Sequence, residues 1–307
     1  MDNANYPIPK RLNLAIAGAH LTLLLGLFWM VGQVESNWAV ATLALFYSIT
    51  MNSAYAMLHE AEHGILQPHP IVNDTVGVLL ALFFPAPFHL QRQGHLGHHM
   101  RNRSDDEAFD FYFAGDNVVW KYLQLYGILS GFFWLVIALA NVLVAVRPAL
   151  VNLKYASFDR PTTALLQSLN PKYARLMQVE AVGTLLCHAA ISVAWQIPVW
   201  RHAALLCSFG CVWSAMQYAH HFGTVRDVRK GTRNLKTLWI LDKIWLNHNW
   251  HLNHHMAPTL PWIYLPNHDV GAECARSSLC LAYLRMWRGP RFTTERVQNR
   301  YAGVIIR

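Results

Sequence analysis

The sequence predicts an all-α integral membrane protein whose four transmembrane helices form two hairpins, with interfacial helices and a histidine-rich cytoplasmic cap. Three observations support this fold class. Hydrophobic residues make up 54% of the 307 residues and charged residues only 14%, against about 25% charged residues in soluble domains. Several apolar runs are long enough for a helix to cross a bilayer. Histidines gather near the ends of these runs, at spacings that put them on one face of a helix.

The first two apolar runs predict a transmembrane hairpin. Residues 12–32 follow Lys10 and Arg11, and no small-residue cleavage site comes after them, so we expect a retained span rather than a signal peptide. A short polar turn leads to the second run, residues 38–58. The hairpin returns the chain to the side of the membrane on which it began, and the sequence HEAEH follows there.

Two further apolar runs are predicted not to cross the membrane as single spans. They cover residues 71–88 and 122–146, and a single crossing by either would put successive histidine clusters on opposite faces of the bilayer. We therefore expect both runs to be interfacial or re-entrant. The loop after residue 146 is rich in Arg and Lys, including Lys154, which predicts that it is cytoplasmic by the positive-inside rule.

The last two apolar runs, residues 179–197 and 203–219, predict the second hairpin. This hairpin ends at His220 and His221. A basic segment follows the two histidines, and we expect it on the cytoplasmic side as well. The four expected spans thus bring every histidine cluster to one boundary of the membrane.

The chain has no internal repeat, low-complexity tract or linker, so we expect one membrane domain over residues 1–307. Its cap should comprise residues 59–121 and 220–307, with both termini in the cytoplasm and the spans in a bacterial inner membrane. The net charge of +8 does not indicate nucleic-acid binding, because the basic residues flank apolar runs rather than forming a stripe with interleaved aromatic residues. The five cysteines form no C-x-x-C pair and are expected to be reduced.

The histidine clusters share spacings that are typical of metal ligands. HEAEH has two histidines four residues apart, HLGHH and HLNHH repeat the H-x-x-H-H spacing, and a further histidine pair precedes the last cluster. Their members are His59, His63, His95, His98, His99, His220, His221, His251, His254 and His255. On a helix with about 100° per residue, each cluster presents its imidazoles on one face. One ion takes roughly four to six ligands. Eight or nine of these imidazoles acting as ligands would be too many for one ion, so we expect two metal ions.

The chemistry of these clusters indicates oxidation. Neutral imidazole suits iron, zinc and copper, and a metal-bound histidine usually gives its other N–H to an acceptor. Suitable acceptors are Glu60, Glu62, Asp105, Asp106, Glu107, Asp110 and Asn253, although the acidic residues from 105 to 110 would equally form a solvated loop. Two metals at a membrane surface favour oxidative attack on a lipid-soluble molecule. Iron and O₂ are then the reasonable agents, because no side chain breaks an unactivated C–H bond.

Three motifs carry a family resemblance. HEAEH, HLGHH and N-x-x-x-H-x-x-H-H, with the trailing P-x-x-P-W-x-x-L-P, resemble the three histidine boxes of the integral-membrane fatty acid desaturase and hydroxylase superfamily. The segment YAHHFG at residues 218–223 is similar to the E-H-Y-G-like segment of related alkane hydroxylases. The resemblance covers roughly residues 40–266 and is specific in its boxes, whereas any membrane protein could share the apolar runs.

The resemblance implies nine iron ligands and several neighbours of the metals. The implied ligands are His59, His63, His95, His98, His99, His221, His251, His254 and His255. The implied neighbours, including Asn247 as the holder of a metal-bound water and His220 at a position that is acidic in relatives, are Asn247, His220, His248, Glu60, Glu62 and Asp106. Leu252 and Asn253 depart from the often acidic pattern of the last box, and His248 adds an imidazole to its face, so the substrate stays open.

The resemblance implies an O₂-dependent oxidoreductase with two non-haem irons that desaturates a fatty acyl chain or a similar lipid. The alternative is a hydroxylase of an alkyl or lipid substrate, and the acyl carrier could be a lipid, CoA or a carrier protein. HEAEH also matches the H-E-x-x-H motif of zinc metalloproteases, with Glu60 as the base. A protease leaves both H-x-x-H-H clusters unexplained, as does a non-catalytic metal or haem carrier.

Electrons are expected from a separate protein of the ferredoxin or cytochrome b5 type with its reductase, because the sequence has neither an H-P-G-G segment nor a cysteine cluster. The basic residues from Arg226 to Lys236 could dock an acidic donor or simply follow the positive-inside rule.

Five further histidines lack a partner at ligand spacing and are predicted to be structural: His69, His89, His188, His202 and His268. His20 and Glu180 lie inside apolar runs, and the sequence shows no partner for either.

Overall fold

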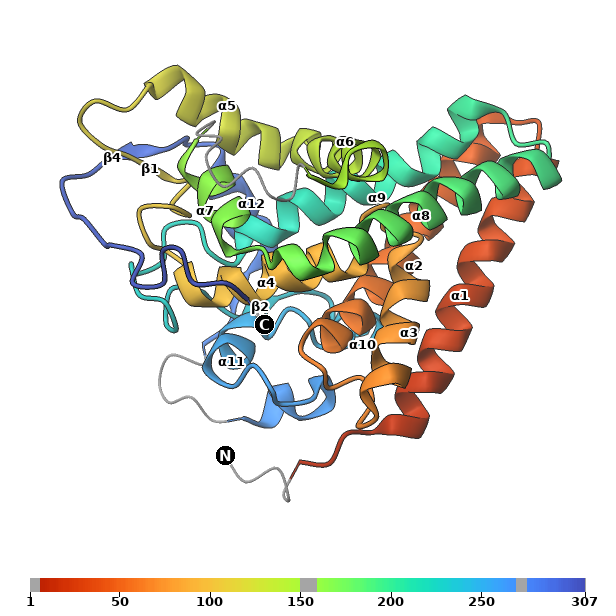
Figure 1. Ribbon diagram of the computed structural model, residues 1–307, viewed down its shortest axis with the longest axis horizontal. Helices are drawn as coiled ribbons and strands as arrows, with labels where there is room; N and C mark the ends of the chain where they lie inside the picture. Colours follow the sequence, from red (N-terminus) through yellow and green to blue (C-terminus); the bar gives the residue numbers. More distant parts are fainter. Residues whose placement is uncertain (1–5, 150–158, 269–274, 307) are drawn as a thin grey trace.

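The computed structural model describes residues 6–149, 159–268 and 275–306, and within these ranges the chain is mostly helical (Figure 1). The α-helices are α1 (Lys10–Gln33), α2 (Asn37–Glu62), α3 (Pro70–Ala81), α4 (Phe88–Arg101), α5 (Val118–Leu129), α6 (Phe132–Val146), α7 (Arg160–Ser168), α8 (Ala174–Ala194), α9 (Val199–Ala219), α10 (Trp239–Ile244), α11 (His251–Met256) and α12 (Leu279–Met286). The 3₁₀ helices are η3 (Pro171–Tyr173) and η4 (Trp262–Asn267). Two parallel strand pairs join β1 (Phe111–Tyr112) to β4 (Arg291–Phe292) and β2 (Leu235–Lys236) to β3 (Ser277–Ser278).

Helix α2 lies at the centre of the long helices and packs against both α1 and α9 (Figure 1). Phe28 of α1, Tyr47 and Met51 of α2, and Phe209 of α9 are fully buried in one apolar core. Helices α8 and α9 are joined by a short turn but splay apart, and α6 packs against both of them. The core therefore fixes the end of α2 that carries HEAEH relative to the end of α9 that precedes His221.

Among the described residues, two helical segments are long and apolar enough to cross a membrane, Lys10–Gln33 and Pro171–Ala194. They contain the expected spans 12–32 and 179–197. The other two expected spans, 38–58 and 203–219, form the long helices α2 and α9 but do not meet this criterion. Their shared interface is polar in places. The chain is thus a membrane protein with two candidate spans, or three if a bent helix pair counts, and the four-span arrangement remains a proposal.

The polar contacts between α2 and α9 are internal hydrogen bonds. Ser48 donates to the carbonyl of Ser208 at 3.1 Å, and Ser208 donates to the carbonyl of Ala44 at 2.7 Å. Small hydroxyl residues allow two helices to approach closely in an apolar environment. Together with more strongly polar residues such as Asn52 of α2 and Arg201 of α9, they lower the hydropathy of both helices.

The apolar run 122–146 is not one straight helix. It forms α5 and α6, which meet at an angle of 88°. Gly131 lies at the break with φ +85°, and a Cβ there would lie 2.6 Å from the Cα of Cys211, so both the bend and the close approach of α9 require glycine. This geometry belongs to a re-entrant loop or a broken span.

The run 71–88 contains α3, which has only 12 residues. Residues 150–158, including Lys154 of the basic loop, lie outside the described residues.

The structure supplies partners for the two ionisable residues of the apolar runs. His20 on α1 hydrogen-bonds to Ser53 on α2 through Nε2 at 2.9 Å. Glu180 on α8 accepts from His89 on α4, from the ring Nδ1 at 2.5 Å and from the backbone N–H at 3.1 Å. The first contact joins the consecutive helices α1 and α2, and the second joins residues 91 positions apart. They therefore have a structural explanation, and that of Glu180 ties α8 to the helix that carries the second histidine box.

Candidate metal centre

The structure brings the nine histidines that were expected to be ligands into two groups. Within each group, one nitrogen from every ring lies within 4.8 Å of the corresponding nitrogen of every other member. The first group is His59, His63, His95, His99 and His254. The second group is His98, His221, His251 and His255. The second and third boxes therefore contribute side chains to both groups, whereas the first box contributes to the first group alone.

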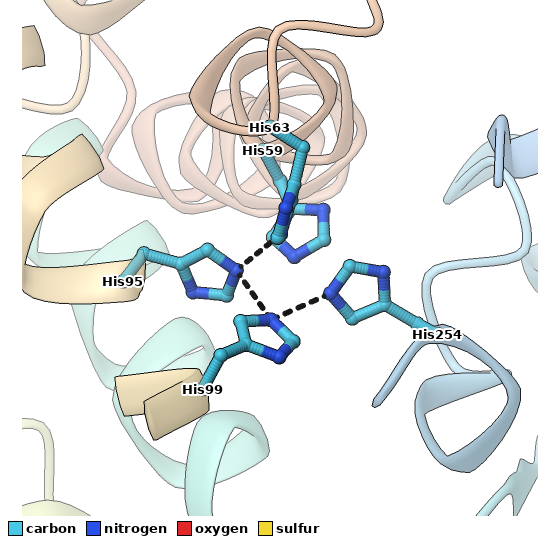
Figure 2. Close-up of side chains that lie close together, drawn as sticks. All are labelled: His59, His63, His95, His99 and His254. Atoms are coloured by element: carbon cyan, nitrogen blue, oxygen red, sulfur yellow. Dashed lines mark hydrogen bonds between the residues drawn. The ribbon is translucent and has the colours of Figure 1, made fainter. Parts of the chain in front are cut away.

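The first histidine group is built mainly from two helices (Figure 2). His59 lies on α2 and His63 is the residue that caps its C-terminus one turn later, while His95 and His99 lie one turn apart on α4. The Nε2 atoms of His63 and His95 are 2.8 Å apart and those of His95 and His99 are 3.1 Å apart, while His254 of α11 closes the group at 2.9 Å from His99. The imidazole nitrogens thus converge on one small volume from three elements.

The second histidine group lies next to the first, with the ring centroids of His99 and His255 4.2 Å apart. The ring of His98 on α4 lies 6.1 Å from that of His95 but only 4.8 Å from that of His221. His251 and His255 lie one turn apart on α11, with centroids 4.8 Å apart. His221 follows α9 in a turn rather than a helix. The H-x-x-H-H spacing is compatible with this arrangement, because neighbouring positions on one helix face can reach two adjacent groups.

Helix α11 carries three of these histidines although it has only six residues, too few to be stable alone. Asn253 holds it in place from a fully buried position. Its amide Nδ2 donates to the carbonyls of Leu265 and His268, and its Oδ1 accepts from Asn234. Leu246 and Asn247, just before the helix, both have φ above +45°. Such left-handed backbone is costly for non-glycine residues, so the surrounding contacts must enforce it.

The electrostatics of the groups suit a cation. Burial, reinforced by neighbouring imidazoles, lowers the pKa of His95, His254 and His255 well below its ordinary value. These rings are therefore neutral at pH 7 and offer lone pairs. Among the described residues, neither ring nitrogen of His255 has a hydrogen-bond partner, and Nε2 of His59 has none. Buried polar atoms without partners are costly, and one metal ion in each group would satisfy them. The residues present thus fit two metals.

Two histidines of the second group have acceptors that orient their rings. Nδ1 of His98 lies 2.7 Å from a carboxylate oxygen of Glu107, and Nδ1 of His221 lies 3.2 Å from the carbonyl of Gly231. Burial alone would raise the pKa of Glu107, but Arg101 and His98 hold it below its ordinary value. Both acceptors turn Nε2 toward the group. Asp106, which was expected in such a role, instead accepts from Asn299 at 2.9 Å.

Two other expected neighbours lie close to the groups without joining them. The ring of His248 lies 4.8 Å from that of His59, and the ring of His220 lies 4.5 Å from that of His251. His220 also hydrogen-bonds to the carbonyl of Arg233 at 3.2 Å. Both rings pack beside ligand candidates, so they shape the walls around the groups.

The remaining expected neighbours have other contacts. Glu60 accepts from the backbone N–H of Trp262 at 3.1 Å, and Asn247 donates to the carbonyl of Trp262 at 3.3 Å. Glu62 is buried, and its Oε2 has no hydrogen-bond partner among the described residues. Trp262 thus ties the segment after the third box to the first box. Glu60 is bound to this backbone and is absent from both histidine groups.

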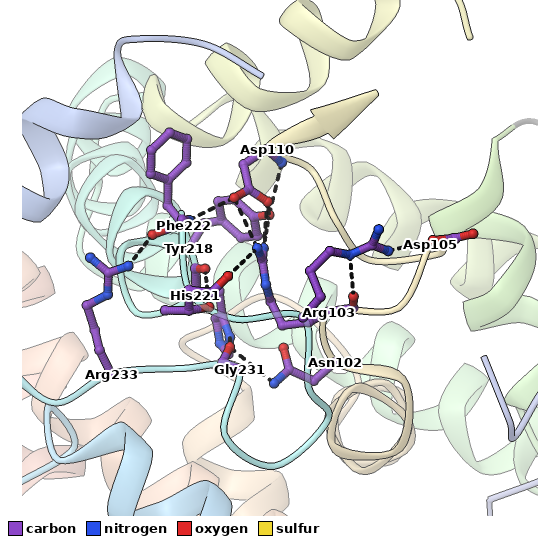
Figure 3. Close-up of polar contacts among 12 residues, drawn as sticks. Asn102, Arg103, Asp105, Asp110, Tyr218, His221, Phe222, Gly231 and Arg233 are labelled. Atoms are coloured by element: carbon purple, nitrogen blue, oxygen red, sulfur yellow. Dashed lines mark hydrogen bonds and ion pairs between the residues drawn. The ribbon is translucent and has the colours of Figure 1, made fainter. Parts of the chain in front are cut away.

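A buried ion pair that the sequence did not indicate supports the second group (Figure 3). Arg103 and Asp110 are both fully buried, with two N–O contacts of 2.5 and 3.1 Å. The hydroxyl of Tyr218 on α9 donates to Asp110 at 2.6 Å. Arg103 also donates to the carbonyl of Thr224, and Asp110 accepts from the N–H of Gly223. The loop after the second box is therefore bonded to both sides of the turn that contains His221.

Comparison with known proteins agrees with this geometry. A family model described as fatty acid desaturase matches residues 36–283, which include all nine histidines of the two groups. No curated protein matches the chain. The match covers well over half of the sequence and includes α2, α4, α9 and α11.

Proposed function

Because the chain belongs to the fatty acid desaturase family, we propose that it is a membrane-bound, O₂-dependent oxidoreductase that desaturates a fatty acyl chain or a similar lipid at a histidine-bound di-iron centre. Membership of the family indicates oxidation of lipids. The di-iron centre, the double bond as product and a cytoplasmic active site in a bacterial inner membrane belong to the proposal. The acyl carrier remains open.

One observation carries the proposal, namely the convergence of nine imidazoles into two adjacent groups. A single ion takes about four to six ligands, so two groups of five and four suit two ions. Iron bound there would supply, together with O₂, the oxidising power that breaks an unactivated C–H bond, which side chains lack. A catalytic role for the groups also accounts for their position at the ends of α2 and α9.

The protein residues have three roles in this function. The buried imidazoles remain neutral and would bind the metals through nitrogen. Glu107 and the carbonyl of Gly231 orient His98 and His221 by holding Nδ1. The burial of His251 and His255 keeps water away from the second group. A dry, preorganised site protects reactive chemistry from solvent.

A zinc protease is a poorer explanation of the same residues. Its base would be Glu60, but this carboxylate accepts from the Trp262 backbone and does not belong to the first histidine group. The four imidazoles of the second group would also have no role. Hydroxylation is the nearer alternative, since it begins with the same removal of hydrogen.

The proposed reaction needs an external electron donor. Forming a double bond removes two hydrogen atoms from the lipid, and reducing O₂ to two waters requires two more electrons and two protons. We propose a ferredoxin or cytochrome b5 type partner with its reductase. Arg226 and Arg233 are engaged within the protein, by Asp105 and by the Phe222 carbonyl. An acidic partner would instead meet Lys236, which is exposed.

Two measurements on the expressed chain test the proposal. Metal analysis of the purified protein should find two irons per chain. Mass spectrometry of lipids from expressing cells should find a product that has lost two hydrogens, compared with cells that express His95→Ala. A product that has gained one oxygen would establish the hydroxylase, and a single zinc with no lipid product would refute the oxidoreductase.

A further inference from the structure

A small cavity lies beside the first histidine group. Its volume is about 10 Å³ and it is lined by residues of α2, α9 and the segment after α10: Asn52, Tyr55, Met216, Gln217, Trp245, His248 and Asn249. A cavity of this size holds about one water-sized group. His248 forms one wall, and the ring of His59 lies 4.8 Å beyond it. Anything bound in the cavity is therefore next to the proposed metals.

Three side chains of the cavity carry buried polar atoms that have no partner among the described residues: Nε1 of Trp245, Nε2 of His248 and Oδ1 of Asn249. Trp245 and Asn249 are 8% and 1% exposed. Leaving such atoms unpaired is costly, so their presence in three residues that line one cavity indicates a polar ligand rather than bare hydrocarbon.

The unpaired atoms define what the ligand must offer. The indole of Trp245 can only donate a hydrogen bond. The amide of Asn249 is fixed in orientation, because its Nδ2 donates to the carbonyl of Leu235 and to Asp242, both at 2.8 Å, so its Oδ1 can only accept. A hydroxyl group accepts from Trp245 and donates to Asn249. A carbonyl oxygen would leave Asn249 unpaired.

The surroundings of the cavity are apolar on the side of α10. This helix immediately precedes Trp245 and exposes large apolar side chains, with Leu238 70%, Trp239 76% and Ile240 47% exposed. Ser53 of α2 donates to the carbonyl of Ile244, which fixes the end of α10 against α2. An exposed apolar surface on a membrane protein suits lipid better than water. Lipid would therefore lie next to α10, the helix that leads into Trp245 of the cavity.

We propose that the cavity binds the hydroxyl group of an alcohol-bearing lipid substrate. This hydroxyl accepts a hydrogen bond from Nε1 of Trp245 and donates one to Oδ1 of Asn249, beside His248. The role of this subsite rests on the proposed lipid oxidation, although its occupancy can be measured without turnover. A hydroxyl oxygen held here would fix the position of that end of the substrate relative to the proposed metals. The distance between the hydroxyl group and the oxidised carbon along the chain would then be constant.

The test compares two probes of equal chain length, 1-hexadecanol and 1-chlorohexadecane, by native mass spectrometry of the purified, detergent-solubilised protein. The wild type should bind the alcohol roughly tenfold more tightly, as expected for one or two net hydrogen bonds. Trp245→Phe, which removes the N–H but keeps an aromatic ring, should reduce the preference to about twofold or less. Trp134→Phe is the matched control, because Nε1 of Trp134 is also buried and without a partner but lies outside the cavity lining.

Equal binding of the two probes by the wild type would overturn the subsite and leave the cavity to water, even if Trp245→Phe failed to fold. An unchanged preference in Trp245→Phe would overturn it as well. Neither result bears on the metals. Conversely, a protein that prefers the alcohol but holds no iron and oxidises no lipid would refute the proposed function while the binding subsite stands.

Discussion

The two histidine groups are held in different ways. The first takes four of its five imidazoles from α2 and α4, as pairs one turn apart on long helices. The second takes His98 from α4, His221 from a turn and two imidazoles from the six-residue helix α11. Helix packing therefore positions the first group, whereas hydrogen bonds between loops position the second. The second group should be the more sensitive to distant substitutions, and the following experiments examine that difference.

The largest effect is expected from loss of a histidine. His95→Ala in the first group and His221→Ala in the second should each abolish lipid oxidation, because each removes a proposed iron ligand. The first group would retain four imidazoles and the second only three, so His221→Ala should lose more iron. Metal analysis and product analysis measure both effects. His69→Ala, at an exposed histidine, should behave as wild type, and full turnover by either ligand variant would contradict the proposed centre.

The next largest effect should come from the buried ion pair. Asp110→Ala leaves the Arg103 charge buried without its partner, which costs about 3–5 kcal/mol of unfolding free energy. Tyr218→Phe removes a hydroxyl that donates to the Asp110 carboxylate and accepts from Arg103 and from the Asp110 N–H, and it should cost about 1–3 kcal/mol. Denaturant unfolding in detergent measures the stability, and iron content reports on the sites.

The ion-pair variants distinguish the two groups if iron is lost mainly from the second. Asp110 is bonded to the N–H of Gly223, two residues after His221, and Arg103 to the carbonyl of Thr224. Equal loss of iron from both groups, resolved by Mössbauer spectroscopy, would show that the loop network does not act on the second group alone.

A smaller and more local effect is expected at Glu107. Glu107→Gln keeps the shape of the side chain but weakens the acceptor for Nδ1 of His98, so metal affinity at the second group should fall about 10- to 100-fold. Competition with a chelator measures the affinity. Asp106→Asn is the matched control, because that neighbouring carboxylate faces Asn299. Similar losses in both variants would assign the effect to loop charge rather than to His98.

The smallest effect should be on the electron donor. Arg229 is unsuitable for charge reversal, because its guanidinium donates to the carbonyl of Met256 at the end of α11. Lys236→Glu should instead raise the apparent KM for an acidic donor about twofold at low salt and less at high salt, with iron content unchanged. Lys172→Glu, at another exposed lysine, is the control. A donor KM that ignores both charge and salt would leave only the positive-inside rule as the explanation.

The sequence predicted the first histidine group better than the second because helical periodicity is a local property. The spacings of His59 with His63 and of His95 with His99 specify neighbours on one helix face before any fold is known. They cannot specify that His98 turns away to meet His221. That contact depends on α9 and on the loop network, which join residues more than a hundred positions apart.

The same distinction explains what the sequence could not reveal about neighbours and spans. Glu107 was one of four acids in a short stretch, and only the fold shows that it meets His98 while Asp106 turns away. Arg103 had no recognisable signal, because a buried arginine is identified by its partner. Composition indicated the membrane but overstated the similarity of the four runs, because α2 and α9 do not meet the criterion for a span that α1 meets. They also hydrogen-bond to each other through Ser48 and Ser208.

The division of the histidines between α4 and the later elements has a consequence for synthesis. Four imidazoles of the first group belong to the first hundred residues, whereas three of the four in the second group come after residue 220. A nascent chain can therefore assemble most of one site before α8 and α9 have left the ribosome, while the other site has a single member. An ion captured at that stage would be held by an incomplete set of ligands. Faithful loading of both sites requires that metal delivery wait until α11 has been made and docked.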